Sequence, residues 1–580
     1  MKVLVPALAS LLVLLHSTSA QIPVTNTYNP PPASFGLNKS APQWNNVLGN
    51  SLFFYDAQRA GKLPANFRVQ WRNDSVLQDG QDVKLDLSSG LFDAGNMIKV
   101  TLPLSWTMSH IMWSATLYGR GFESSSQTAY LDEVLRNGLD WLLEATSVNT
   151  SIVVQVGTTQ DNYWGGDLSI PKSRPSYIVS AEKPGTDVVA SVAAAFAAGY
   201  LLYSGTALPL RANGDNKGGS VPSSLQNVTY AQTLLTRAQS LYAFAQTAQP
   251  QQVAQRVVPA LDDSYPSSDW RDKLAYAGAM LTLATGDGVV ANQTLQQYAD
   301  ISMPQIGTAL NWDARAPAIS VLLAQAAVLH PNLGLNLTRF QSDTEAWLDP
   351  FAKGSASRGS SVSFTPGGLA WWQGYSSSSS LNPAMNAAAV ALVYSGFATG
   401  NKASTYLSFG HSQIDYVLGK NPMNAVYMVG QSPNSAENPH SALASGGTDI
   451  GNIDNNPPVE AHVLYGALVG GPDHKDRYYD IRSDYIQTEP ALDLQAGLVF
   501  LAASQVANST ATQPFYVGLT TPRLRPIKNR NAEGGSGIPK WGQIAIAVVV
   551  LVVVFVGGGW IAWWQRENLR YWWRHKRMGL

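Results

Sequence analysis

The sequence predicts one large, mostly α-helical domain followed by a single C-terminal transmembrane helix. Two observations support this prediction. Across residues 46–506, apolar residues recur at helical spacing in stretches separated by long loops that are rich in Trp, Tyr, Gly, Asp and Pro. Near the C-terminus, residues 544–564 contain no charged residue. No change in composition divides the body of the chain, so we expect a single domain there.

The N-terminus has the build of a secretory signal. Lys2 precedes a mostly apolar run at residues 3–15, and the small residues after it end in Thr18-Ser19-Ala20, a small-x-small cleavage site. We therefore predict a signal peptide at residues 1–20. Residues 21–45 are rich in Pro, Asn and Ser and are predicted to form a leader before the domain.

Helical periodicity marks seven stretches of the domain. Within them, apolar residues recur three or four positions apart, as on the buried face of a helix. Thr186 is a candidate N-cap for one helix, and Pro490 suits the first turn of another. The predicted helices cover residues 130–142, 187–203, 230–248, 272–284, 316–328, 386–397 and 490–506. This pattern predicts a helical scaffold that carries its chemistry on long loops.

The C-terminal apolar run is long enough to cross a membrane. At about 1.5 Å per residue, its length matches the roughly 30 Å hydrocarbon core of a bilayer. Trp residues flank it, and a tail with five Lys or Arg residues and one Glu follows, which is typical of the cytoplasmic side. This predicts a stalk at 507–540, a transmembrane helix at 541–564 and a cytoplasmic tail at 565–580. A cleaved lipid-anchor signal is less favoured, because such signals end in apolar residues.

The predicted signal and anchor together make the chain a single-pass type I membrane protein with its domain outside the cell. Seven Asn-x-Ser/Thr sequons precede the predicted span, which is consistent with a cell-surface glycoprotein. They begin at Asn38, Asn73, Asn149, Asn227, Asn292, Asn336 and Asn508. The chain has no Cys, which excludes disulfides and thiolate metal sites. Its net charge of −1 gives no reason to expect a nucleic-acid partner.

The abundance of aromatic residues favours a carbohydrate cleft. The chain has 17 Trp and 24 Tyr, many of them beside Asp, Gly or Ser in predicted loops. Flat rings stack on the apolar faces of sugars while polar neighbours hydrogen-bond the hydroxyl groups. Composition alone leaves open the alternative that these rings fill the core.

Three groups of motifs point to a particular chemistry. The first group contains FFYDAQRAGKLPANFRVQWRNDS at residues 53–75 and DVKLDLSSGLFDAGNMIKV at 82–100. The second contains NPH at 438–440 and HVLYGALVGGP at 462–472, and the third is YYDIRSDYIQTEPALDLQAG at 478–497. Together they resemble glycoside hydrolase family 9, the inverting β-1,4-glucanases also called family E cellulases. The matching blocks follow the family's order over nearly the whole predicted domain.

The resemblance rests on specific positions. Residues 54–64 match the family's F-Y-x-x-Q-R-S-G-x-L-P block, with Ala60 in place of Ser, and residues 71–75 match its W-R-x-D-S turn. The family's terminal signature is matched by Tyr478, Asp480, Tyr485, Glu489 and Ala491, with Gln495 where the family has Asn. The resemblance implies an (α/α)₆ barrel of six inner and six outer helices with an open cleft at one end.

The chemistry expected of this family needs two carboxyl groups. One carboxyl with a raised pKa delivers a proton to the leaving oxygen of the glycosidic bond. A second takes a proton from a water on the opposite face of the sugar, and in inverting enzymes the pair stands about 6.5–9.5 Å apart. The resemblance implies that Glu489 is the general acid. Asp480, by its spacing from Glu489, is expected to position that acid.

The position of the usual base departs from the family. The family's motif is D-A-G-D, whose second Asp is assigned as the base and whose first Asp helps to orient the water. This chain has Asp93-Ala94-Gly95-Asn96, and an amide can hold a water but cannot accept its proton as a carboxylate does. Losing a positioned base costs roughly 10²–10⁴-fold in rate. Asp93 is the candidate that could replace it.

Substrate-binding positions are partly kept. Leu91 stands where the family has Trp before its D-A-G-D motif. In the family's N-P-H-H-R run, His440 keeps the substrate-binding His and Ala442 replaces the Arg. The D-H-x-x-W-G segment appears at residues 161–165 without its His. The aromatic residues expected in the cleft are Trp164, Tyr265, Trp270, Trp312, Trp371, Trp372 and Tyr485, although each could instead belong to the core.

The leading interpretation is a tethered hydrolase of internal β-1,4-glucosidic bonds in cellulose or a related cell-wall β-glucan. Its catalytic set would be Glu489, Asp93, Asn96, Asp480 and His440. Two alternatives stay open: a base-impaired protein that only binds glucan, and a hydrolase of altered glucan specificity. No cofactor is required by this chemistry, although some members of the family bind a structural Ca²⁺ and acid-bearing loops such as 473–480 could serve. The expected partners are β-glucan and the membrane, and not nucleic acid.

Overall fold

The computed structural model describes residues 21–148, 151–160, 162–215, 221–301, 308–355, 361–508, 512–521, 525–526, 566 and 570. The chain divides into two units after Arg525, and all the elements named below belong to the first unit. The predicted signal peptide, the transmembrane helix and most of the stalk and tail lie outside the described residues. Asn149 and Asp161 lie outside them as well.

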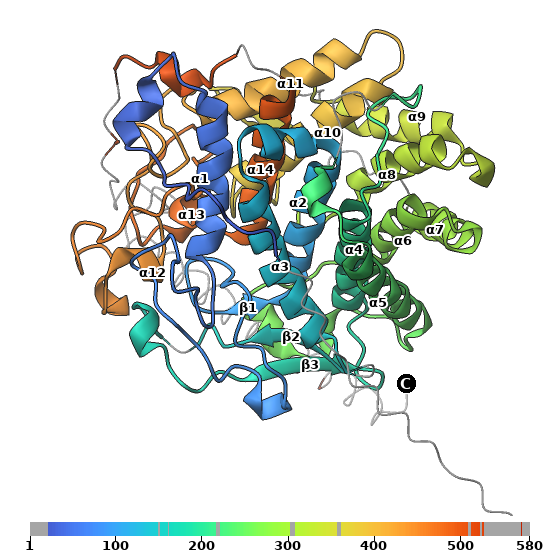
Figure 1. Cartoon of the computed structure of the whole chain (residues 1–580), viewed down its shortest axis with the longest axis horizontal. Coiled ribbons are helices and arrows are strands. Elements are labelled where there is room, and N and C mark those ends of the chain that lie inside the picture. The colour runs from blue at the N-terminus through green and yellow to red at the C-terminus, as the bar shows by residue number, and fades with distance from the viewer. Residues whose placement is uncertain are drawn as a thin grey trace, which may run out of the picture. The chain divides into compact units, whose positions relative to one another are not determined.

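Six helices form an inner ring (Figure 1). Each packs against the next along the chain, and the last packs back against the first. They are α2 (Thr101–Ser124), α4 (Thr186–Tyr203), α6 (Arg271–Thr285), α8 (Ala316–Leu329), α10 (Leu381–Tyr394) and α14 (Leu492–Asn508). Nearly all of their residues are buried, because neighbouring helices cover them on both sides and a second ring covers them outside.

Six further helices form the outer ring. Each packs on one inner helix: α1 on α14, α3 on α2, α5 on α4, α7 on α6, α9 on α8 and α11 on α10. They are α1 (Gln43–Ala57), α3 (Thr128–Ala145), α5 (Val228–Thr247), α7 (Gly288–Asp300), α9 (Leu337–Leu348) and α11 (Ala403–Val417). Outer and inner helices alternate along the chain, so the predicted double ring of helices, the (α/α)₆ barrel, is confirmed for the described domain.

Apolar periodicity did not predict five of these twelve helices, namely α1, α2, α7, α9 and α11. Helix α2 shows why. The hydroxyl groups of Ser105, Thr107 and Thr116 donate to carbonyl oxygens three or four residues earlier in the same helix, at 2.7–2.9 Å. Polar side chains satisfied in this way can be buried, and they hide the apolar periodicity of a core helix.

Helix ends differ from the prediction in two places. Thr186 is the first residue of α4 and does not cap it; its hydroxyl accepts the N–H of Gln252 at 3.2 Å instead. Pro490 lies just before α14, which begins at Leu492. Both residues therefore lie near the true ends of their helices. Tertiary contacts decide which hydrogen bonds their groups make.

Short strands and helices fill the loops. Strands β1 (Lys99–Val100), β2 (Ser151–Val156) and β3 (Ser176–Ser180) form an antiparallel sheet in that order, and β2 packs against α2 and α3. Strands β4 (Val362–Phe364) and β5 (Ala370–Trp372) form a hairpin. Helices α12 (Ala442–Ser445) and α13 (Tyr485–Thr488) are single turns. The strands add local detail to a helical fold and do not change its class.

The predicted leader is part of the domain. The N–H of Ile22 donates to Asp132 at 2.9 Å and the N–H of Tyr28 donates to Tyr130 at 2.7 Å, so the leader lies against α3. Helix α1 also begins inside the predicted leader. These contacts bury backbone donors that a free leader would leave to water.

The predicted stalk begins later than residue 507. Tyr516 is fully buried and its hydroxyl accepts from Gln431 at 2.7 Å. Arg525 also contacts the domain. The described residues 512–521 and Arg525 therefore belong to the domain, and a free stalk would start after Arg525.

Two helical stretches of the described residues are long and apolar enough to cross a membrane. They are Thr186–Tyr203 and Tyr485–Asn508. Both are mostly buried inside the domain, as helices of a large core are. The predicted span at 541–564 is a different segment and lies outside the described residues.

Candidate active site

Three segments far apart in the sequence meet at one place through their backbones. The N–H of Ala442 donates to Gly95 O at 2.8 Å, and the N–H of His440 donates to Thr488 O at 3.0 Å. The N–H of Leu492 donates to Asp93 O at 3.0 Å. The last bond satisfies one of the free donors at the start of α14. These bonds hold together the loop that carries Asp93, the segment that carries Glu489, and residues 437–441, called the histidine loop below.

The end of α1 holds the loop of Asp93 from behind. Gln58 Nε2 donates to Phe92 O at 3.2 Å and to Ala94 O at 2.8 Å. In return, the N–H of Phe92 donates to Gln58 O at 2.8 Å. Gln58, from the motif block at residues 54–64, thus fixes the backbone of the loop that carries Asp93.

Glu489 has the environment of a proton donor. It is half-buried, follows α13 directly, and its Oε1 accepts the N–H of Gly95 at 3.0 Å. Burial raises the pKa of Glu489, while the charge of His440 and the hydrogen bond from Gly95 act in the opposite direction. A carboxyl with a raised pKa can keep its proton until the leaving oxygen needs it.

Asp93 lies deeper than Glu489. It is 1% exposed, and its Oδ2 accepts the hydroxyl proton of Tyr265 in a short hydrogen bond. Its Oδ1 has no hydrogen-bond partner among the described residues. Burial first, and then the negative charge of Asp493, raise the pKa of Asp93 well above its usual value, and the bond from Tyr265 opposes them.

Asp493 was not among the predicted site residues. It lies in the first turn of α14 and its Oδ2 accepts from Asn382 at 2.5 Å. Burial raises the pKa of Asp493 to about 6, and the charge of Glu489 adds to this. No local pattern marked it, because the extended backbone of Glu489 separates α13 from α14 and helical spacing does not link the two residues.

Gly95 and Asn96 belong to the same loop as Asp93. Asn96 is half-buried, and its Oδ1 accepts the N–H of Ile98 at 3.2 Å. Its Nδ2 makes no hydrogen bond within the described part of the chain. A Cβ on Gly95 would lie 2.2 Å from His440 O and 2.9 Å from Glu489 Oε1, so only Gly fits there.

His440 is held in a defined orientation. Its Nδ1 lies 2.8 Å from Arg482 O. A carbonyl only accepts, so Nδ1 carries the proton and Nε2 is left to face other groups. Trp164 lies 4.8 Å from the ring and is 5% exposed, so it supports His440 rather than offering a face to sugar. Tyr485, 59% exposed, lies 6.1 Å from the same ring.

Asp480 lies behind the histidine loop and not beside the acid. Its carboxylate accepts the backbone N–H groups of Glu437, at 2.9 and 3.2 Å, and of Asn438, at 3.0 Å. The hydroxyl of Tyr478 donates to it at 3.2 Å. Asp480 therefore shapes the loop that leads to His440, and it acts on the site through that loop.

The predicted cleft aromatics divide into two groups. Tyr265 and Trp312 meet edge to face at 4.8 Å, and both are half-buried, as are Trp270 and Trp371. Trp372 is fully buried against Phe351, 5.3 Å away. The prediction of substrate contact is therefore wrong for Trp372. Neighbours on a strand point to opposite faces, so β5 turns Trp371 outward and Trp372 into the core.

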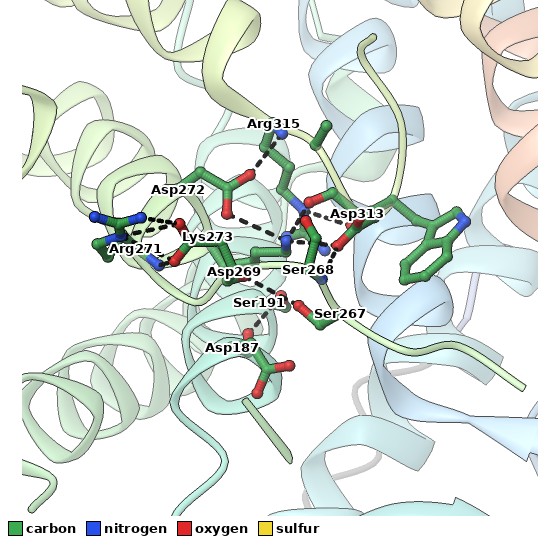
Figure 2. A network of polar contacts seen from close by, with 12 residues as sticks. Asp187, Ser191, Ser267, Ser268, Asp269, Arg271, Asp272, Lys273, Asp313 and Arg315 are labelled. Carbon is green, nitrogen blue, oxygen red and sulfur yellow. Dashed lines mark hydrogen bonds and ion pairs between the residues drawn. The ribbon is translucent and has the colours of Figure 1, made fainter. Parts of the chain in front are cut away.

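A buried charge network supports the loop of Tyr265 (Figure 2). Lys273 is fully buried and donates to Asp313 Oδ1 at 2.9 Å and to its backbone carbonyl, and it lies 3.2 Å from Asp272. Asp313 Oδ1 also accepts the N–H of Ser268 at 2.7 Å. Buried ion pairs of this kind specify one geometry more than they add stability. Here the network ties the loop of Asp313 to the loop that carries Tyr265.

Arg315 belongs to the same network and holds Trp312. Its Nε donates to Trp312 O at 3.1 Å, and its N–H donates to Asp272 at 2.8 Å. The guanidinium also lies over the rings of Trp106 and Tyr276, at 5.3 and 5.5 Å. Trp312 was predicted from its motif, whereas no sequence pattern marks the buried cation that fixes its backbone.

The fold and the site together define a class of protein. A double ring of helices with a half-buried acid carboxyl, a second carboxyl held nearby and aromatic rings on the surrounding loops is the arrangement of a glycoside hydrolase. The model of Glycosyl hydrolase family 9 matches residues 44–502. The chain belongs to this family.

Curated relatives carry the name endoglucanase. Endoglucanase A of Bacillus pumilus is 35% identical over 470 residues, which cover 79% of this chain and 66% of the relative. Endoglucanase 24 of Oryza sativa subsp. japonica is 30% identical over 508 residues, covering 82% of this chain and 89% of the relative. The chain spans less than two thirds of some relatives, for example 42% of Endoglucanase B of Cellulomonas fimi.

Solved structures share the fold. The endoglucanase of the termite Nasutitermes takasagoensis is 30% identical with a TM-score of 0.67, and the match covers 80% of this chain and 98% of that one. Endoglucanase CelQ of Clostridium thermocellum, complexed with cellobiose and cellotriose, is 28% identical with a TM-score of 0.68, and the match covers 84% and 74%. The helical double ring is thus the fold of these endoglucanases.

Proposed function

We propose that this chain hydrolyses internal β-1,4-glucosidic bonds of cellulose or a related β-glucan with inversion of configuration. The observation that carries the proposal is the pair of carboxyls, Glu489 and Asp93, on loops that are hydrogen-bonded to each other. The half-buried rings of Tyr265 and Trp312 beside Asp93 support a sugar-binding surface there. The relatives named endoglucanase support the choice of substrate class.

The proposed mechanism moves two protons. Glu489 gives its proton to the glycosidic oxygen as the bond between that oxygen and the anomeric carbon breaks. A water, held by the amide of Asn96, attacks the anomeric carbon from the opposite face and gives its proton to Asp93. Glu489 is left ionised and Asp93 protonated, and exchange with solvent restores both. Tyr265 steadies the ionised form of Asp93 through its hydrogen bond.

The stereochemistry of the product tests this mechanism. Proton NMR of the reducing ends released from soluble cello-oligosaccharides should show the α-anomer first, because a β-linkage is inverted. Glu489→Ala should lose roughly 10²–10⁴-fold in rate, since it removes the acid. Release of the β-anomer, or full activity of Glu489→Ala, would contradict the assignment.

A second candidate is a protein that binds glucan without cleaving it. Two observations favour it: Asn96 cannot take a proton, and Asp93 is 1% exposed. Asn96→Asp separates the two functions, because it restores a carboxylate where the family has its base. On the hydrolase proposal, wild type is active and Asn96→Asp is faster by about tenfold or more. If both proteins bind soluble β-glucan and neither cleaves it, the binding function is the correct one.

A third candidate is altered glucan specificity. Ala442, where the family has Arg, is buried in an apolar cluster with Phe92, Met97 and Trp164. The cleft therefore lacks the cation that this position supplies in the family. Rates on β-1,4-glucan, mixed-linkage β-glucan and xylan test the point, and a preference for either of the latter would favour this candidate.

We also propose that the domain is held at the cell surface by the helix at 541–564, as a type I membrane protein. The proposal rests on the apolar run and its basic flank. Protease treatment of intact cells should remove the domain and leave a protected C-terminal fragment. A chain recovered whole from culture medium would contradict it.

N-glycosylation belongs to the same proposal. The side chains of five sequon residues are exposed, namely Asn38, Asn73, Asn292, Asn336 and Asn508. Asn227 is half-buried and caps α5 by accepting from the N–H of Tyr230, so it is the described sequon least suited to a glycan. Mass spectrometry after enzymatic deglycosylation identifies the occupied sites.

A structural Ca²⁺ in the loop at 473–480 stays a prediction. Among the described residues, no group of three or more His, Asp or Glu could hold a metal ion. The acids of the loop already bind protein donors: Asp473 accepts from Arg477, Asp476 from Tyr416 and the N–H of Gly367, and Asp480 as described above. An unchanged melting temperature in the presence of a chelator would argue against calcium.

A further inference from the structure

Arg525, the last residue of the first unit, reaches back to the segment that precedes the histidine loop. Its Nη2 donates to the carbonyl oxygens of Asn434, at 2.9 Å, and Ser435, at 3.1 Å, and its Nη1 donates to Asn434 Oδ1 at 3.3 Å. Its Nε lies 3.6 Å from Asp480 Oδ2, and its guanidinium lies 5.5 Å from the ring centre of Tyr478. The side chain is 16% exposed. A residue at the start of a free stalk would make none of these contacts.

Asp480 connects Arg525 to the histidine loop. The carboxylate that faces Arg525 also accepts the N–H groups of Glu437 and Asn438. The backbone of Asp480 has a φ of +57°, in the left-handed region. A residue other than Gly stays there only where its surroundings hold it. Arg525 supplies the counter-charge, and removing one partner of such a pair leaves a buried charge unpaired.

The loop then leads to the acid. His440 lies two residues beyond Asn438, and its N–H donates to Thr488 O, next to Glu489. The charge of His440 lowers the pKa of Glu489 against the effect of burial. A loosened loop would let the imidazole move away from the acid. Arg525 is therefore connected to Glu489 through Asp480, the backbone of residues 437–438 and His440.

We propose that Arg525 is a positioning residue for the acid side of the site. The segment that leads toward the predicted anchor thus completes the catalytic fold as well as tethering it. For its kinetic readout this inference rests on the proposed hydrolase function. For its structural readout it rests only on the contacts of Arg525.

The test uses the full-length chain with three substitutions at one position. Arg525→Met removes charge and donors, Arg525→Gln keeps a donor without charge, and Arg525→Lys keeps charge without the planar set of donors. Arg477→Met is the matched control, because Arg477 lies in the same loop and pairs there with half-buried Asp473. We measure kcat, KM and the pH profile on soluble β-glucan, and amide hydrogen exchange of residues 434–440.

Arg525→Met is expected to lower kcat about tenfold with little change in KM, because a small displacement at the reacting groups is costly. The alkaline limb of the pH profile of kcat reports the pKa of the general acid. In Arg525→Met this limb should move to higher pH, since the pKa of Glu489 rises when His440 moves away. Exchange at Glu437 and Asn438 should rise. Arg525→Gln and Arg525→Lys should lie between wild type and Arg525→Met, and Arg477→Met should match wild type.

The exchange measurement separates this inference from the proposed function. If wild type is inactive but exchange at 437–438 rises in Arg525→Met, the proposed hydrolase function fails and the positioning role stands. If exchange, kcat and the alkaline limb are all those of wild type, the positioning role is overturned, whatever happens to the melting temperature. Should Arg525→Met not fold, the same outcomes are read from Arg525→Gln.

Discussion

The acid side and the base side of the candidate site are built differently. On the acid side, Glu489 is half-buried, and its oxygen meets the N–H of Gly95. On the base side, Asp93 is almost fully buried and shares its environment with Tyr265 and a second carboxyl, Asp493. The acid side keeps the family's terminal signature up to Glu489, whereas the base side has lost the carboxylate at position 96.

This difference shows that a replacement base needs an accessible oxygen as well as basicity. Asp93 has one oxygen engaged by Tyr265 and one without a partner in the described structure. A buried carboxylate oxygen without a partner is where a water or a substrate group is expected to bind. In the proposed mechanism, Glu489 donates the proton on the acid side, and the base side depends on Asp93 Oδ1 reaching the water.

Substitution of Asp93, on the base side, should give the largest loss of activity. Asp93→Asn should lower kcat by roughly 10²–10⁴-fold, because it removes the proposed base. In the Asn96→Asp background the same substitution should cost less, since a second carboxylate is then present. Steady-state kinetics on soluble β-glucan measure both effects. Asp86→Asn, at an exposed acid in the same segment, is the control, and wild-type activity in Asp93→Asn would show that Asp93 is not the base.

Gly95 joins the two sides, so a methyl group there should damage both. In Gly95→Ala the new Cβ would meet His440 O and Glu489 Oε1 at 2.2 and 2.9 Å. A displacement of this size at the reacting groups costs about 10²-fold in rate. Gly166→Ala is the matched control, because no atom lies within 4 Å of a Cβ at Gly166. Equal activity of the two variants would mean that the loops move apart without harm.

Individual helices could be predicted from the sequence where apolar residues dominate them. Helices α4 and α8, which are buried on all sides, had clear patterns. Helix α2 is just as buried, but its Ser and Thr hydroxyls hydrogen-bond to carbonyls of the same helix. These polar residues interrupt the apolar pattern, so the helix was not predicted. The arrangement of twelve helices into two rings came from the family resemblance, because periodicity says nothing about which helices are neighbours.

The site was predicted from the sequence only where a motif marks it. Glu489, Asp93 and His440 lie within recognisable motifs, and the structure brings their loops together. Lys273 could not be found in this way, because a buried cation that holds a loop has no local pattern. Trp371 and Trp372 were assigned alike, and only the strand geometry separates the half-buried ring from the fully buried one. Motifs identify reacting groups, and tertiary contacts decide the groups that hold them.

Substitution of Tyr265, also on the base side, should have a smaller effect, which is a shift in the pKa of Asp93. Its hydrogen bond favours ionised Asp93 and so lowers the pKa of that group. Tyr265→Phe removes this effect, so the pKa of Asp93 rises and the acidic limb of kcat/KM should move to higher pH. The alkaline limb, which reports Glu489, should stay. Tyr200→Phe, at a half-buried Tyr on α4, is the control, and a shift of both limbs together would contradict the assignment of Asp93 to the acidic limb.

Substitution of Asp493 should change the pKa of Asp93 in the opposite direction. Its charge raises the pKa of Asp93, so Asp493→Asn should move the acidic limb to lower pH, by about one unit. The pKa of Asp493 itself is raised from 3.8 to about 6 in the folded protein. Ionisation of Asp493 therefore opposes folding, and the free energy of unfolding of wild type should fall relative to Asp493→Asn as the pH rises from about 4 through 6. Urea titrations across this range measure the difference. Limbs that move in the same direction in Asp493→Asn and Tyr265→Phe would show that the two residues do not act on a common carboxyl.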